Sequence, residues 1–393
     1  MGFLGKLFDK PPTKDAFARI AADQMVACGW PEPIYEPADF LLRIGTTQEI
    51  CGLENAYRSY LQQPKGERAA FLERWFSGIR NMRQPQTFDE ARDMLLPMVR
   101  QRGEWLNMKV PNPETLLKPS RFFSEDLRLA LALDRPTTVS VVNEANVTTW
   151  GVDEDALYEA ALHNLRLKSA DAWSQPFPGV FVSGWRDTFD ATRAIFTDLI
   201  RRVPIEGEPV IMTPNRNHLF VASRRDETAV QRMVTAAAEL FDAGDYSLSM
   251  QPLTLEDETW VPYTPTGPAA NEVRKRVLSV LATTYANQKQ RFESTTEVFY
   301  ATLMLATKTD TGETLSVGTW AKDVDTLLPR ADRIAFVRAK GDVASVAWEE
   351  AESIVGPLVA EPGPWPPRYH VTMFPDDEQY AKLKAIEANK SSA

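Results

Sequence analysis

Proline content most constrains how this chain folds, because 28 of its 393 residues are proline and most lie between periodic segments. Proline fixes φ and lacks a backbone N–H, so it ends helices and strands where it occurs. We therefore predict many short elements with sharp ends. At this length, two or three domains are the natural expectation.

The composition predicts a soluble protein, because 44% of the residues are hydrophobic and 25% are charged. No apolar run approaches the ~18 residues that cross a bilayer. The first ten residues alternate apolar and charged side chains and show no signal peptide. Cys28 and Cys51 have no CxxC spacing, which predicts buried, reduced thiols. We expect a cytoplasmic location.

Charge is unevenly spread along the chain, whose formal net charge is −10. Residues 121–264 carry 13 basic and 22 acidic side chains, whereas residues 1–120 are close to neutral. An acidic block repels a phosphate backbone, and no basic stripe with interleaved aromatics is visible. We therefore expect no nucleic acid partner, while a local basic pocket for a small anion remains open.

Residues 1–12 form a short amphipathic tail, with four large apolar side chains and two lysines among its first ten residues. Such a tail is compatible with weak contact to a membrane surface or a partner. The composition favours a terminus that frays or docks on the chain itself.

Hydrophobic periodicity divides the remainder into an N-terminal α/β unit at 13–119, a central domain at 120–264 and a C-terminal α+β domain at 265–393. The predicted helices are 13–28, 55–62, 67–82, 88–100, 156–168, 188–202, 227–241, 269–290 and 377–388. The predicted strands are 40–44, 49–53, 127–133, 138–142, 179–183, 209–213, 219–223, 253–255, 259–261, 298–306, 313–320, 333–338, 343–347 and 368–373. We therefore predict an α+β fold of two to three small units, with short, mostly antiparallel sheets flanked by helices.

Three acidic residues, Asp153, Glu154 and Asp155, precede the helix 156–168. Carboxylates at this position face the positive end of the helix dipole and accept from its first N–H groups. We interpret them as helix-capping residues and not as catalytic residues.

Histidine restricts the possible chemistry, because the chain has only His163, His218 and His370. No two of them have helical ligand spacing, and HExxH and CxxC are absent, so we predict no metal site. Ser183 follows an apolar strand but lacks the upstream glycine of a nucleophile elbow. No phosphate-binding glycine loop is present either, and we predict no cofactor.

The most distinctive polar group is the turn Pro214-Asn215-Arg216-Asn217 between two apolar runs, followed by His218. Pro and Asn suit hairpin turns, but turn geometry does not require Arg216. Its guanidinium either holds a carboxylate or phosphate or forms a salt bridge that braces the turn, with Asp190 as a neighbour. The candidate ligand-binding residues are Arg216, Asn215, Asn217, His218, Asp190 in the preceding predicted helix 188–202, and Asn164 in the predicted helix 156–168.

Trp320, Trp348 and the run 362–368 with Trp365 give the C-terminal domain an aromatic, proline-rich rim. Peptide-binding grooves have this composition. Core tryptophans and rigid loops have it too.

The central domain resembles the YtpQ-like family of bacterial proteins, a domain without an established activity. The pieces that carry the resemblance are FFSEDLRLALALDRP, TTWGVDEDALYEAALHNL, DATRAIF and EPVIMTPNRNHLFVASRRD. The resemblance covers about 121–263, and is weaker over 13–100. It implies a bacterial origin but no ligand or catalytic residue. Where the family pattern reads Pro-x-Arg-Asp, this chain has Asn217, and an amide cannot act as a general acid or base.

These observations lead to three functional hypotheses. The first is a non-catalytic module that binds a small ligand or a protein through the central domain. The second is an enzyme of unassigned class that uses the polar residues at the Pro214–Asn217 turn. The third is a peripheral membrane-surface adaptor that attaches through residues 1–12.

Overall fold

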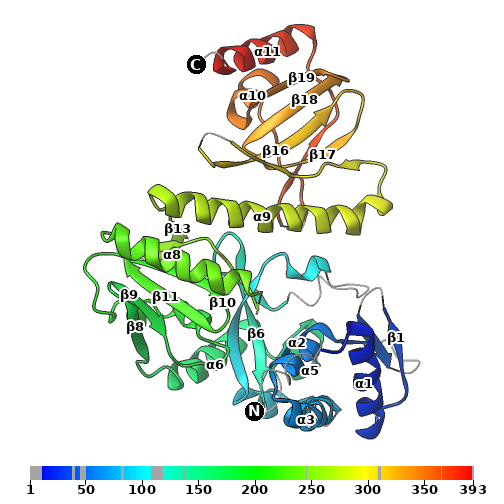
Figure 1. Ribbon diagram of the computed structural model, residues 1–393, viewed down its shortest axis with the longest axis vertical. Coiled ribbons are helices and arrows are strands. Elements are labelled where there is room, and N and C mark those ends of the chain that lie inside the picture. The colour runs from blue at the N-terminus through cyan, green and yellow to red at the C-terminus, as the bar shows by residue number, and fades with distance from the viewer. Residues whose placement is uncertain are drawn as a thin grey trace, which may run out of the picture. The chain divides into compact units, whose positions relative to one another are not determined.

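The computed structural model describes residues 11–37, 40–44, 50–80, 84–107, 118–135, 139–244, 246–308, 311–363 and 365–391. It confirms the α+β class, with short and mostly antiparallel sheets flanked by helices (Figure 1). The first ten residues of the predicted tail, the turn 45–47 and most of the proline-spaced segment 111–119 lie outside the described residues.

The chain divides into two compact units. The first comprises residues 1–94 and 133–140, and the second comprises residues 95–132 and 141–393. The sequence placed domain boundaries at 119/120 and 264/265, and these remain predictions.

The first unit packs helices around a small antiparallel sheet of order β1-β2-β3. Its elements are α1 (Lys14–Ala27), β1 (Pro33–Glu36), β2 (Leu41–Ile44), β3 (Ile50–Gly52), α2 (Glu54–Gln62), η2 (Lys65–Glu67), α3 (Arg68–Arg80) and α4 (Phe88–Arg92). Phe17 and Phe76 are fully buried in its core. Thr13 caps α1 by accepting from the Ala16 N–H at 3.2 Å.

Cys28 and Cys51 are free thiols, as predicted, but each is half-buried instead of buried. Desolvation raises the pKa of Cys51 to about 11. The Cys51 thiol is therefore protonated at neutral pH and is a poor nucleophile.

Next along the chain is a sheet of order β4-β6-β5, to which β7 adds beside β6. The elements here are β4 (Leu95–Gln101), η3 (Glu104–Asn107), β5 (Ser120–Phe122), β6 (Leu127–Asp134), β7 (Val139–Val141), α5 (Glu144–Trp150) and α6 (Glu154–Leu167). The carboxylate of Asp153 accepts from the Ala156 N–H at 2.8 Å and caps α6, which confirms its predicted role.

A six-stranded sheet of order β13-β12-β10-β11-β9-β8 follows, and α8 covers one of its faces (Figure 1). Its elements are β8 (Trp173–Phe177), β9 (Val180–Ser183), η5 (Ala191–Ile195), α7 (Thr197–Ile200), β10 (Pro209–Asn215), β11 (His218–Ser223), α8 (Glu227–Asp242), β12 (Leu253–Glu256) and β13 (Thr259–Pro262). Strands β10 and β11 pair antiparallel, with Met212 opposite Phe220 and an irregularity between Met212 and Asn215.

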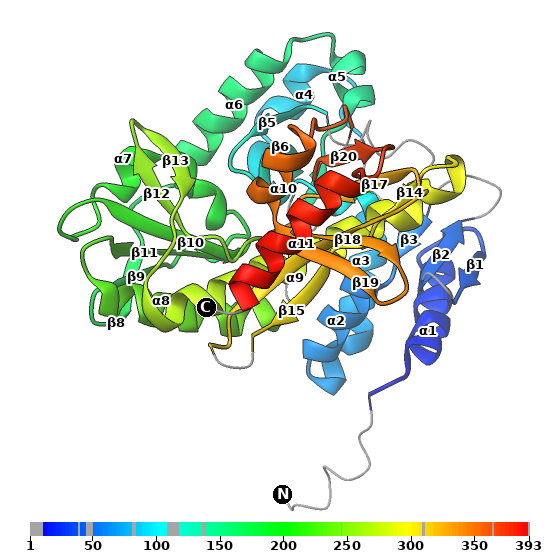
Figure 2. The same ribbon diagram turned by 90° about the horizontal axis from the view of Figure 1, so that it is seen from above.

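The long helix α9 (Gly267–Phe292) packs against α8 on one side and against β15 and β16 on another (Figure 1). Beyond it lie η6 (Glu293–Thr295), β14 (Phe299–Tyr300), β15 (Met304–Thr307), β16 (Thr314–Ala321), β17 (Thr326–Pro329), β18 (Arg333–Ala339), β19 (Asp342–Ala347), α10 (Trp348–Val355), β20 (Arg368–Val371) and α11 (Asp377–Ser391). They form sheets of order β15-β16-β18-β19 and β14-β17-β20. Helix α11 packs against β19 (Figure 2).

The helix predicted at 88–100 is wrong beyond Arg92, because Leu95–Gln101 is strand β4. The first five residues of strand β4 are all buried. A strand covered on both faces reads as a continuous apolar run and shows no alternation. The apolar run of β4 therefore cannot be told from a buried helix by periodicity alone.

The helix predicted at 188–202 is also wrong, because this stretch contains the short 3-10 segment η5 and a single α-helical turn, α7. Arg193 is fully buried and donates to both carboxylate oxygens of Asp187, at 2.8 and 2.6 Å. Thr192 accepts from the Val99 N–H at 3.1 Å. Because the segment is held from several sides, tertiary contacts replace a regular helix.

The strand predicted at 298–306 is divided between two sheets. Strand β14 pairs parallel with β17, whereas β15 pairs antiparallel with β16. The residues between them are not in a strand, and the Ala301 carbonyl accepts from Arg368 at 2.8 Å.

Candidate functional site

The turn between β10 and β11 uses its own polar groups to hold its shape. Asn215 is only 3% exposed. Its side-chain oxygen accepts from the Asn217 N–H at 3.0 Å and lies 2.8 Å from His218 Nδ1. Asn215 and the backbone of Asn217 therefore account for the turn, as the Asn preference for such positions predicts.

His218 stacks on Phe220, with the two rings 15° from parallel. Burial lowers the pKa of His218, an effect that the nearby carboxylate of Asp190 opposes. The ring is thus neutral at neutral pH. Asp190 itself is buried and accepts from the backbone N–H groups of Arg186 and Asp187 at 3.3 and 3.2 Å.

The guanidinium of Arg216 belongs to a different group of residues. It stacks on the ring of Tyr246 at 3.8 Å and donates to the sulfur of Met98 at 3.6 Å. Burial, followed by the charge of Arg100, lowers the pKa of Arg216 to about 10. Within the described ranges no ion pair joins Arg216 to Asp190.

Asn164 donates to the Leu95 carbonyl at 2.9 Å, at the first residue of β4. The structure therefore brings Asn215, Asn217, His218 and Asp190 together. It places the Arg216 guanidinium and the Asn164 amide elsewhere.

A cavity of about 370 Å³ lies where the segment 248–251, α9 and the segment around Trp365 meet. Apolar and aromatic side chains provide most of its lining: Leu248, Met250, Pro262, Val277, Val280, Leu281, Tyr285, Trp365, Pro366, Pro367 and Tyr369. Glu125, Asp126, Ser249, Gln251 and Arg330 add polar groups. A largely apolar wall with a few polar groups is typical of a small-molecule site. We call it the Trp365 cavity.

Asp126 is the most unusual polar group of the Trp365 cavity. Its carboxylate accepts from the hydroxyls of Ser249 and of Ser124, the latter at 3.0 Å. Desolvation nevertheless raises the pKa of Asp126, while the two serine hydrogen bonds act in the opposite direction. A carboxyl with a raised pKa in a cavity is a recognised mark of a functional position.

Arg330 supplies the basic group of the cavity. Its Nη2 donates to Glu349 at 2.8 Å, and its guanidinium stacks on Trp348 at 4.4 Å. Its Nη1 is buried and has no hydrogen-bond partner among the residues that the structure describes. Buried donors are normally paired, so an unpaired one beside a cavity indicates a missing acceptor.

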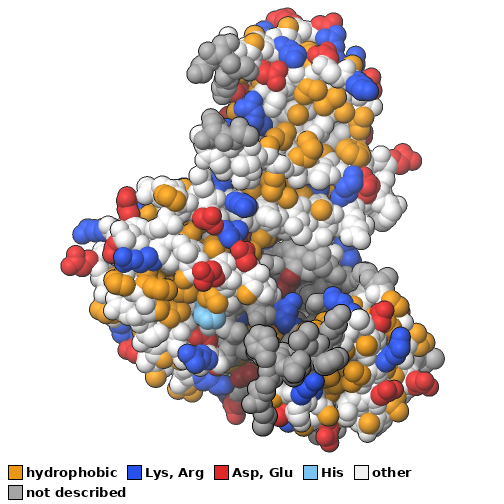
Figure 3. All heavy atoms as spheres, in the orientation of Figure 1, with side chains coloured by type: hydrophobic (Ala, Val, Ile, Leu, Met, Phe, Trp, Pro, Cys, Tyr) orange, Lys and Arg blue, Asp and Glu red, His pale blue; other side chains and the backbone are white. Residues whose placement is uncertain are grey.

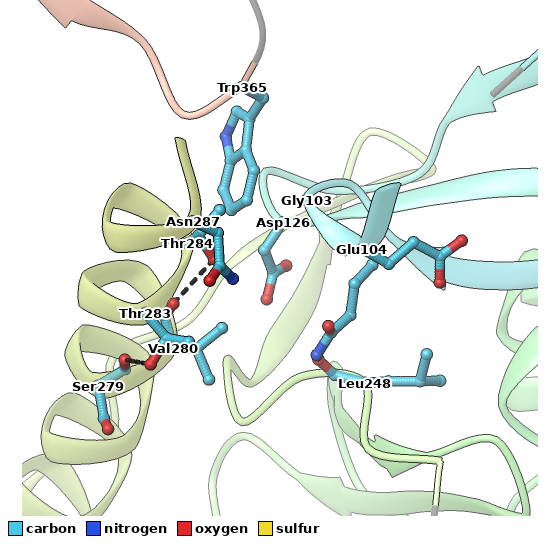
Figure 4. Close-up of a pocket in the computed structure, with 11 residues that line it drawn as sticks. Gly103, Glu104, Asp126, Leu248, Ser279, Val280, Thr283, Thr284, Asn287 and Trp365 are labelled. Atoms are coloured by element: carbon cyan, nitrogen blue, oxygen red, sulfur yellow. Dashed lines mark hydrogen bonds between the residues drawn. The ribbon is translucent and has the colours of Figure 1, made fainter. Parts of the chain in front are cut away.

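A smaller, more polar cavity of about 220 Å³ adjoins the first and shares Asp126, Leu248, Val280 and Trp365 with it. The polar side chains of Thr283, Thr284 and Asn287 come from α9 (Figure 4). A Cβ on Gly103 would lie 2.6 Å from the Thr284 side chain and 3.4 Å from the Trp365 ring, so the absence of a side chain permits this close approach.

Sequence reasoning identified the rim of this site but not its polar groups. Trp365 was noted as part of an aromatic, proline-rich run. Asp126 lies directly before the buried strand β6, in the motif Ser124-Glu125-Asp126, and this position was its only sequence signal. Arg330 follows β17 and has no local signal at all.

In the described part of the chain, no three His, Cys, Asp or Glu side chains are placed to hold a metal ion. No helix among the same residues is both long and apolar enough to cross a membrane. On the face shown in Figure 3, basic and acidic side chains are interspersed and form no continuous basic stripe.

No protein-family model matches the chain, and the searches of curated proteins and of solved structures found no match. Membership of the YtpQ-like family therefore remains a prediction from the motifs quoted above.

Proposed function

We propose that this protein binds a small, largely apolar molecule carrying one acidic group, and that it does so in the Trp365 cavity without transforming the ligand. The observation that carries the proposal is the combination of an apolar lining with the unpaired, buried Nη1 of Arg330. Arginine donors suit carboxylate and other oxyanions, and the apolar walls suit a hydrocarbon or aromatic body.

Asp126 supplies the second polar contact in this proposal. Because burial raises its pKa, the carboxyl holds a proton to higher pH than an ordinary aspartate. A protonated carboxyl donates to a ligand oxygen, and it does not repel an anionic ligand. Ligand affinity should therefore fall as the pH rises and Asp126 ionises.

The polar residues of the β10–β11 turn offer weaker support for an enzyme. Asn215 and Asp190 already accept from groups of their own turn and loop, and the guanidinium of Arg216 is directed to Tyr246 and Met98. A catalytic site needs such groups available to a substrate. The enzyme hypothesis therefore remains a prediction.

The membrane-adaptor hypothesis rests on residues 1–12, most of which lie outside the described residues. It remains a prediction, as does the cytoplasmic location.

Anilinonaphthalene sulfonate, an aromatic molecule with one anionic group, is a suitable probe of the proposal. A fluorescence titration of the full chain should saturate at one equivalent. The variant Arg330→Gln should raise the dissociation constant about tenfold, because it removes a charged hydrogen-bond donor.

Arg338→Gln is the matched control. Like Arg330, Arg338 stacks on an aromatic ring, that of Tyr380, and donates to a carboxylate, that of Asp377, at 2.8 Å. It does not line the Trp365 cavity. If Arg330→Gln and Arg338→Gln bind the probe equally well, the proposal is wrong.

A further inference from the structure

Two arginines from distant parts of the sequence meet at one methionine. Arg100 Nη1 lies 3.8 Å from the sulfur of Met98, and Arg216 Nη1 lies 3.6 Å from the same atom. The two nitrogens therefore cannot lie farther apart than the sum of these distances. Like charges this close repel one another unless an anion lies between or beside them.

The nearest carboxylate is already engaged. Glu104 accepts from Arg100 Nε with both oxygens, at 3.0 and 2.7 Å, and from Arg128 Nη2 at 2.8 Å. Figure 4 shows its carboxylate turned away from α9. The negative charge of Glu104 is therefore paired with Arg100 and Arg128 and not directly with Arg216.

Among the described residues, the guanidinium of Arg216 has no strong hydrogen-bond acceptor. Its hydrogen bond within the described residues is to a thioether, which is a weak acceptor. Its ring contact with Tyr246 fixes the plane of the guanidinium but accepts none of its in-plane N–H groups. The repulsion from Arg100 contributes to the lowered pKa of Arg216.

Solvent reaches this group of residues. The Arg100 side chain is 20% exposed, and Arg216 is half-buried. A small anion therefore has access without rearrangement of the core.

We infer that Arg100 and Arg216 form a binding site for a small oxyanion, such as a phosphate group or a carboxylate. The oxygens of the anion accept from both guanidinium groups, with Met98 and Tyr246 holding the two side chains in place. Guanidinium donors match the geometry of such oxyanions better than ammonium groups do. This site is distinct from the Trp365 cavity, whose lining includes neither arginine.

Isothermal titration of the full chain with inorganic phosphate, and separately with malonate, tests the site and distinguishes the two ligand chemistries. Sodium chloride at equal ionic strength is the control for screening. We expect saturable binding of one equivalent of phosphate or malonate and no heat of binding with chloride. Arg216→Gln should weaken the binding at least about tenfold, and Arg216→Lys should weaken it less.

Arg224→Gln is the matched control variant. Arg224 also lies over a tyrosine ring, that of Tyr263 at 5.7 Å, but it is exposed and lies at the other end of β11. Its substitution should leave the affinity unchanged. Equal affinities of Arg216→Gln and Arg224→Gln would overturn the inference.

The wild-type protein alone is also decisive, whatever the stability of the variants. If phosphate, malonate and chloride at equal ionic strength give the same heat of binding, the charges of the two guanidinium groups are compensated within the chain. No anion site then exists.

Discussion

The β10–β11 turn and the Trp365 cavity both gather polar side chains, but they differ in whether those groups already have partners. At the turn, the side-chain oxygen of Asn215 is hydrogen-bonded to the Asn217 N–H and to His218 Nδ1. The Asp190 carboxylate accepts from two backbone N–H groups. At the cavity, Arg330 Nη1 is buried and has no partner within the described part of the chain, and Asp126 is hydrogen-bonded yet has a raised pKa. Satisfied polar groups stabilise a fold, whereas unsatisfied ones beside a cavity are available to a ligand.

The largest change in stability is expected for a substitution in the β10–β11 turn. Asn215→Ala removes the oxygen shared by the Asn217 N–H and His218 Nδ1, at a position only 3% exposed. It should lower the free energy of unfolding by about 2–4 kcal/mol, because two part-buried polar groups lose their acceptor. Urea denaturation measures the loss as a lower midpoint with an unchanged slope.

Asn217→Ala provides the control, because Asn217 contributes its backbone N–H to the turn. Its cost should be below about 0.5 kcal/mol. Equal losses for the two variants would mean that the Asn215 oxygen does not brace the turn. Binding of anilinonaphthalene sulfonate by the folded protein should be the same for both.

The next effect concerns the cavity and depends on pH. Asp126 has a pKa raised above its ordinary value of 3.8, so the folded state binds its proton more tightly than the unfolded state does. The associated stability is present at low pH and is lost as the pH rises through the folded pKa. Asp126→Asn should therefore stabilise the protein at pH 7, because it removes a charged form that burial disfavours.

This advantage should shrink as the pH falls below 3.8, where the wild-type carboxyl becomes protonated in the unfolded state as well as in the folded state. Thermal unfolding of the two proteins across this range measures the difference. A constant difference at all pH values would show that Asp126 ionises normally in the folded protein.

The smallest change in stability is expected for His218 in the turn, and its pH dependence is opposite to that of Asp126. His218 has a pKa lowered from its ordinary value of 6.5, mainly by burial. Its neutral form is favoured in the folded state, so stability should be lost as the pH falls below about 6.5. His218→Asn retains a nitrogen near the position of Nδ1 but cannot become charged.

The stability of His218→Asn should therefore decrease less than that of the wild type between pH 7.5 and 5.5, by about 1 kcal/mol or less. Urea denaturation at the two pH values provides the measurement. Parallel losses in the two proteins would assign the pH dependence to other groups.

Sequence periodicity predicted the elements whose apolar residues lie on one face. Helices α6, α8 and α9 and strands β10 and β11 fall within a few residues of their predicted positions. It did not predict β4, whose buried run has no alternation, or η5, whose shape depends on Arg193 and Asp187. It also missed β17, which has only four residues, and β8, whose side chains are mostly exposed.

The candidate site was less predictable, because its polar groups meet only in the folded chain. Ser249 donates to Asp126 from 123 positions away in the sequence. Arg100 and Arg216 share Met98 although they lie on β4 and at the β10–β11 turn. The expectation that Arg216 has an additional role beyond the turn came from turn chemistry, but its neighbour Arg100 had no sequence signal.

The most direct test of a binding function in the Trp365 cavity is native mass spectrometry with anilinonaphthalene sulfonate, comparing the wild type with Val280→Trp. Val280 lies on α9 and lines both cavities, so an indole there fills the shared space. With circular dichroism confirming that both proteins are folded, we predict one bound probe molecule on the wild type and none on the variant. Equal occupancy of the two proteins would contradict a binding site in this cavity.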